Sequence, residues 1–118
     1  MINMIMLVLH DPEQLEDITR AWNEAGAPGI TILSSLGMGR LRNKSGLRDD
    51  LPLIPSLHDL LDQEELYNRT LFTIVEGEET VERIVSATQQ ITGDLDEPDT
   101  GILVVLPVSQ AYGLHRKR

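Results

Sequence analysis

The chain has no cysteine and few aromatic residues, which make up only 3% of its 118 positions. The absence of cysteine excludes disulfides, zinc sites with thiolate ligands and thiol nucleophiles. The scarcity of aromatic side chains means that a core has to be built from aliphatic residues. Such a core is typical of helices packed on a sheet rich in Val, Ile and Leu.

Basic residues are also scarce. The chain has 10 Lys and Arg and 19 Asp and Glu, which gives a net charge of −9. An acidic chain of this kind repels nucleic acids and anionic membranes. Its basic residues gather in two short runs, at 40–48 and 116–118, which favour local anion sites over a nucleic-acid footprint. The apolar N-terminal run, residues 1–9, is too short to span a bilayer. We therefore expect a cytoplasmic protein without a nucleic-acid partner or membrane insertion.

Four apolar segments predict β-strands, at residues 2–9, 30–36, 70–75 and 102–106. Two segments with apolar residues at helical spacing predict α-helices, from Pro12 to Ala25 and over residues 78–91. Asp11 is the expected cap of the first helix, with Gln14 closing a capping box. We further expect a short helix over residues 56–65 and an edge strand over residues 108–114. Pro107 suits a strand end or an edge.

The order strand, helix, strand, insertion, strand, helix, strand predicts an α+β fold. Two βαβ-like halves then form the ferredoxin-like βαββαβ sandwich, an antiparallel sheet with two helices on one face. We expect a single domain over residues 1–118 with a loop insertion at about 37–69. The strands are nearly continuous apolar runs, so the face without helices has to be buried as well. Copies of the same chain are the simplest cover, which predicts a homo-oligomer.

Three stretches of the chain resemble the PII-like signalling proteins of the nitrogen regulatory protein P-II superfamily. They are residues 17–31, the Gly37-Met38-Gly39-Arg40 turn, and residues 92–104 from Thr-Gly to Gly-Ile-Leu-Val. The resemblance implies a homotrimer whose sheets surround a central axis, with ligands in the clefts between subunits. It also implies that adenine nucleotides are candidate ligands, namely ATP, ADP or AMP, and that a long loop, here residues 41–53, contacts a partner protein.

The resemblance also assigns ligand-binding residues to the two sides of each cleft. It places Thr31, Gly37, Gly39 and Arg40 on one side, and Thr92, Gly93 and Gly101 on the other. The glycines of the Gly-x-Gly-Arg turn permit a tight backbone that presents N–H groups to an anion, and Arg40 adds a positive charge. The C-terminal residues His115, Arg116 and Arg118 are expected to reach a neighbour's cleft and to hold a phosphate or carboxylate.

Residues 94–101 differ from the family's pattern, which has a lysine for phosphate in the corresponding turn. Here the turn has no basic residue and holds four carboxylates, those of Asp94, Asp96, Glu97 and Asp99. Two like charges about 4 Å apart repel by about 4 kcal/mol at an effective dielectric constant of about 20. This acidic loop, together with three histidines, favours an alternative function: a divalent-metal-responsive trimer similar to the CutA family.

A third hypothesis is a small enzyme on the same scaffold, since fold alone does not decide function. The sequence shows no Ser-His-Asp constellation and no paired-carboxylate motif. The prediction is therefore a regulatory or ligand-sensing protein and not an enzyme.

Overall fold

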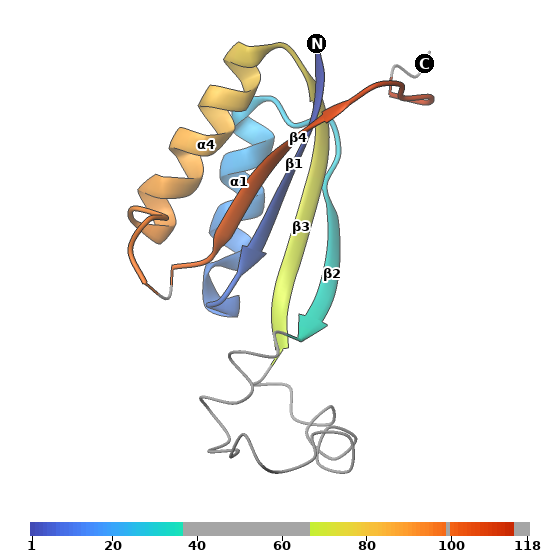
Figure 1. Ribbon diagram of the computed structural model, residues 1–118. Helices are drawn as coiled ribbons and strands as arrows, with labels where there is room; N and C mark the ends of the chain where they lie inside the picture. The colour runs from blue at the N-terminus through green and yellow to red at the C-terminus, as the bar shows by residue number, and fades with distance from the viewer. Residues whose placement is uncertain (37–66, 99, 115–118) are drawn as a thin grey trace, which may run out of the picture. The chain divides into compact units, whose positions relative to one another are not determined.

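The computed structural model describes residues 1–36, 67–98 and 100–114 (Figure 1). Contacts divide the chain into a larger unit, residues 1–33 with 69–118, and a smaller one, residues 34–68. The larger unit contains every candidate site residue that is described. The predicted helix at 56–65 and the predicted insertion, up to residue 66, lie outside the described residues.

The described residues form four strands, two α-helices and a short 3-10 helix. In chain order they are β1 (Ile2–Leu9), η1 (Pro12–Gln14), α1 (Leu15–Ala25), β2 (Thr31–Leu36), β3 (Tyr67–Glu76), α4 (Glu78–Thr92) and β4 (Ile102–Val108). The sheet order is β2-β3-β1-β4, with β1 antiparallel to both β3 and β4. Both helices lie on one face of the sheet (Figure 1). The predicted ferredoxin-like sandwich is therefore confirmed.

The start of α1 differs from the prediction. Asp11 does cap the chain, since its Oδ1 accepts the Glu13 backbone N–H at 3.0 Å, but the first turn is a 3-10 turn and α1 begins only at Leu15. Gln14 does not close a capping box. Its Nε2 donates to the carbonyl of Ile91 at 3.3 Å, which ties the beginning of α1 to the end of α4.

The predicted edge strand at 108–114 is wrong beyond Val108, where β4 ends. Val108 pairs with Ile2, the first residue of β1, so later residues have no β1 partner. The start of β3 also differs from the prediction. It begins at Tyr67 and not at residue 70, and Arg69 continues the pairing with Leu9 of β1. Pro107 lies on the edge strand, as expected, where its missing N–H interrupts no second ladder.

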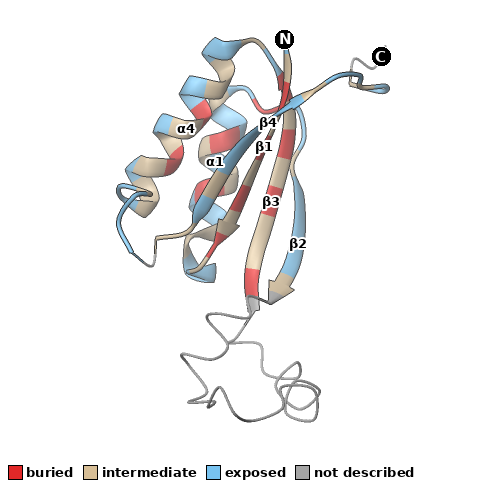
Figure 2. Cartoon of the chain, viewed as in Figure 1, coloured by how far each residue is buried: buried red, intermediate tan, exposed pale blue. Residues whose placement is uncertain are grey.

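The core lies between the sheet and the helices. Every second residue of β1 is buried, and Ile5, Leu7 and Leu9 are fully inaccessible. They pack with Ile18 and Trp22 of α1 and with further buried residues, Leu71, Val75 and Ile84. Burial of one such side chain contributes about 2 kcal/mol. Figure 2 shows the buried positions in the middle of the sheet and on the helices, and extended exposed stretches on β2 and β4.

Candidate functional site

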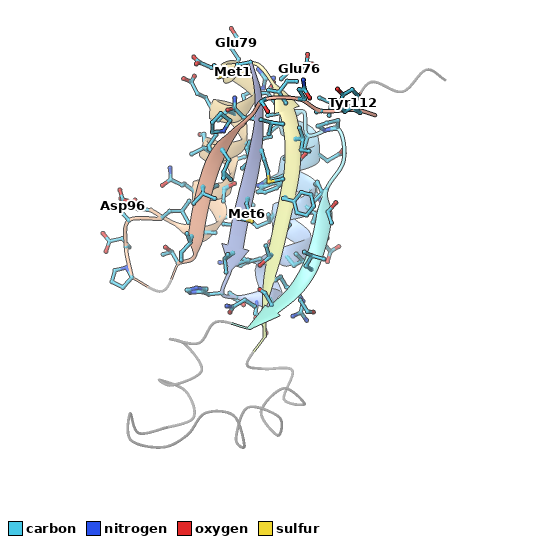
Figure 3. The ribbon with its side chains drawn as sticks, turned by 45° about the vertical axis from the view of Figure 1, so that its right-hand side comes forward. Met1, Met6, Glu76, Glu79, Asp96 and Tyr112 are labelled. Atoms are coloured by element: carbon cyan, nitrogen blue, oxygen red, sulfur yellow. The ribbon has the colours of Figure 1, made fainter. Side chains whose placement is uncertain are left out.

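The face of the sheet opposite the helices is a continuous apolar surface. The other residues of β1, Ile2, Met4, Met6 and Val8, are only partly buried. Directly opposed residues share a face, so their partners extend this surface on β3 and β4. We call the whole set the open face: Ile2, Met4, Met6, Val8, Thr70, Phe72, Ile74, Glu76, Ile102, Val104, Leu106 and Val108. Figure 3 looks onto it, with Met6 near the middle.

The open face is apolar and accessible. Its residues Ile102 and Leu106 in β4 are 58% and 42% exposed. Glu76 is the only ionisable residue of the set, and it lies at one end, opposite Ile2. A contiguous apolar surface without charges in its middle is a feature of interaction sites on proteins. The apolar second face that the sequence predicted is therefore present.

Two of the predicted cleft residues, Thr31 and Gly101, lie at opposite edges of the sheet. Thr31 is the first residue of β2, at one edge, and Gly101 directly precedes β4, at the other. Strands are about 4.8 Å apart, so the three intervals from β2 to β4 amount to about 14 Å. Within one chain the structure does not bring Thr31 and Gly101 together. A cleft that contains both would need the β2 edge of one copy and the β4 edge of another.

Gly101 is required by a close approach between two backbones. It has a φ of +130°, and a Cβ at this position would lie 2.7 Å from the carbonyl oxygen of Val8. The close approach allows β4 to enter the sheet with Ile102 opposite Val8. The structure therefore gives Gly101 a role in strand pairing, whether or not it also contacts a ligand.

Thr92 and Gly93 end α4. The Thr92 hydroxyl lies 3.2 Å from the Thr88 carbonyl and 2.8 Å from the Gly93 carbonyl, to which it donates. Gly93 has a φ of +84°, and its N–H donates to the carbonyl of Gln89 at 2.9 Å. The side chain of Gln89 also accepts the N–H of Leu95 at 3.1 Å. Gln89 thus anchors the following loop, a role that its helical position in the sequence did not indicate.

The loop after Gly93 is organised by Asp94. Its Oδ1 accepts the Asp96 N–H at 2.9 Å and its carbonyl accepts the Glu97 N–H at 2.9 Å. The side chains of all three residues are exposed, and Figure 3 shows Asp96 at the outside of the loop. An anion that approaches Gly101 from this side would meet their carboxylates.

The CutA-like alternative needs a set of metal ligands. In the part of the chain that the structure describes, no three His, Asp or Glu side chains are grouped so that they could hold a metal ion. Asp99, His58 and His115 lie outside the described residues, and so do the predicted site residues Gly37, Gly39, Arg40, Arg116 and Arg118 and the 41–53 loop. None of the described helices is long and apolar enough to cross a membrane.

Solved structures of similar fold include two of GlnK from B. subtilis. One has a TM-score of 0.55 at 11% identity, covering 92% of this chain and 85% of that chain. The other, described as a GlnK–ATP complex, has a TM-score of 0.57 at 12% identity, covering 92% and 82%. At this level of identity they establish a common fold.

No curated protein matches the sequence. A family model described as nitrogen regulatory protein P-II, however, matches residues 2–118. That match spans nearly the whole chain and agrees with the observed strand order and helix placement. The chain therefore belongs to the P-II nitrogen regulatory protein family, a family of signalling regulators.

Proposed function

We propose that this protein is a homotrimeric regulator that binds a small anionic ligand, an adenine nucleotide, in the clefts between its subunits. Binding would change what the loop at 41–53 presents to a partner protein. The role is regulatory and not catalytic, and the cytoplasmic location expected from the sequence is part of the proposal.

The open face carries this proposal. The described helices cover one side of the sheet, and among the described residues the other side exposes a band of Ile, Leu, Val, Met and Phe side chains with one ionisable residue at its end. Burial of apolar surface contributes about 25 cal/mol per Å², so covering this band with identical faces is strongly favourable. Closed rotational symmetry allows each copy to be covered by its neighbours without leaving an open end.

The edge positions of the cleft residues support ligand binding between subunits. Thr31 in β2 and Gly101 beside β4 belong to one cleft only if neighbouring copies supply one edge each. The Gly37-x-Gly39-Arg40 turn follows β2 directly in the sequence, so it would belong to the same side as Thr31.

The GlnK–ATP complex among the structures of similar fold supports an adenine nucleotide as the ligand. In this chain the acidic loop at 94–97 would oppose a polyphosphate, while Arg40, Arg116 and Arg118 would attract it. Because salt screens the repulsion, we expect the acidic loop to weaken ATP binding most at low ionic strength.

Two measurements test the proposal. Sedimentation equilibrium at micromolar concentration should give three times the chain mass of 13.2 kDa. The mass of a monomer would contradict the proposal, because clefts between subunits do not exist in a monomer. Isothermal titration with ATP, ADP and AMP should give saturable heats. Heats equal to the buffer control for all three would reject nucleotide binding and leave the assembly untouched.

A further inference from the structure

The outer surface of the helical layer contains a groove between α1 and α4. It has a volume of about 680 Å³, within the range of ligand-binding clefts. Small side chains from both helices, Ala21, Ala25 and Ala87, leave room along its floor, and the groove also includes the carboxylate-bearing residues Glu24, Glu79 and Glu82.

The two helices hold the groove in a defined shape. Beneath it, Trp22 of α1 is hydrogen-bonded to Thr88 of α4. At its surface the Arg83 Nε donates to the carbonyl of Ala25 at 3.1 Å, and the Arg83 Nη2 donates to the Thr80 hydroxyl at 3.0 Å. The Trp22–Thr88 and Arg83–Ala25 hydrogen bonds join the two helices, while the Arg83–Thr80 bond lies within α4.

The charge of the groove is negative. Three glutamates and one arginine line the groove. The guanidinium of that arginine, Arg83, already donates two hydrogen bonds within the protein. The other cation of the two helices, Arg20, lies 3.5 Å from Glu16 and 3.6 Å from Asp17, so carboxylates already surround it. The potential along the groove therefore favours a positively charged occupant.

We propose that this groove docks a cationic segment of a partner protein. Lys or Arg side chains of the segment pair with Glu24, Glu79 and Glu82, and its small or aliphatic residues lie on the alanine floor. A nucleic acid would be repelled, and the described residues show no grouping of carboxylates that could hold a metal ion. The groove is lined by residues of α1 and α4, and both helices lie on the side of the sheet opposite the open face (Figure 1), so self-association through that face leaves it accessible.

The test uses the full chain and a fluorescein-labelled helical peptide of Ala, Lys and Arg, followed by fluorescence anisotropy. The wild-type chain should bind the peptide, and added salt should weaken the affinity. The double variant Glu24→Gln/Glu82→Gln removes two of the proposed pairs and should lower the affinity about five- to tenfold. Glu13→Gln/Glu97→Gln is the matched control, because it removes the same charge at exposed positions that do not line the groove.

A second variant tests the floor without changing the charge. Ala87→Leu places three additional carbon atoms in the groove and should lower the affinity for the peptide by a similar factor. The circular dichroism spectrum should stay that of the wild type. An equal loss in both double variants, or an unchanged affinity for Ala87→Leu, would overturn the groove as the docking site.

The occupant is tested with a peptide of residues 40–48 of this chain, the basic run noted above. If it bound this groove more tightly than the designed peptide, the occupant would be a second copy of the chain and the assignment to a partner protein would be overturned. Weaker binding supports a partner. Trimer mass and nucleotide heats are separate readouts, so failure here does not affect the proposed function.

Discussion

The indole Nε1 of Trp22 donates a hydrogen bond to the Thr88 hydroxyl at 2.8 Å, which joins α1 to α4 in the interior of the protein. The Thr88 hydroxyl in turn donates to the carbonyl of Ile84 at 2.7 Å. Both side chains are fully buried. In the described part of the chain no buried side-chain nitrogen or oxygen lacks a hydrogen-bond partner. The pair thus fixes Trp22, the one aromatic residue among the described core residues, without leaving its N–H unsatisfied.

Thr88→Val should lower the free energy of unfolding by about 1–3 kcal/mol, because the buried indole N–H loses its acceptor. Urea denaturation followed by far-UV circular dichroism measures the change, because Trp22 is the single tryptophan of the chain and the comparison below replaces it. Thr88→Val in a Trp22→Phe background, where no N–H is left unpaired, should cost clearly less. The same cost in both backgrounds would show that the hydrogen bond does not contribute.

Gly101→Ala should destabilise the fold by about 2 kcal/mol or more, because the new Cβ would meet the Val8 carbonyl oxygen and the φ of +130° is unfavourable for a side chain. Gly29→Ala is the matched control, since nothing lies within 4 Å of its Cβ position and its φ is not in the left-handed range. Equal midpoints of thermal unfolding for the two variants would contradict the close approach of β4 to β1.

Met6→Glu should dissociate the proposed trimer. The substitution puts a charge in the middle of the open face, and desolvating a carboxylate without a partner costs several kcal/mol. Gln90→Glu adds the same charge at an exposed position of α4 and should leave the assembly unchanged. Sedimentation equilibrium measures the mass of the assembly that each variant forms. A trimeric Met6→Glu protein would mean that the open face is not the interface between subunits.

Asp96→Asn/Glu97→Gln should increase the affinity for ATP by several-fold at low salt and by less at high salt, because two exposed carboxylates near the proposed phosphate position are removed. The backbone N–H groups that form the turn on Asp94 are kept. Titration calorimetry at two ionic strengths measures the effect. An unchanged affinity would place the phosphates away from this loop, and Glu13→Gln/Glu16→Gln serves as the charge-matched control.

Much of the fold followed from local patterns. The apolar run of residues 2–9 predicted β1 with its observed bounds, and α1 ends at Ala25 as predicted, where Gly26 follows with a left-handed φ of 110°. The predicted cleft residues were harder to interpret. Gly101 was expected as a ligand-side residue, but its described contact is with the backbone of Val8, from which it is separated by more than ninety positions in the chain.

The amino-acid sequence by itself determined which segments become strands and helices, that the sheet has two apolar faces, and that the chain is acidic. These properties depend on the period of apolar residues and on composition, which neighbours in the chain define. Only the tertiary structure decided that Thr31 and Gly101 lie at opposite edges, that Gln14 holds the end of α4, and that a groove with three glutamates lies between the helices. The reason is physical: strand order, register and helix packing are set by contacts between distant segments, and no local pattern encodes those distances.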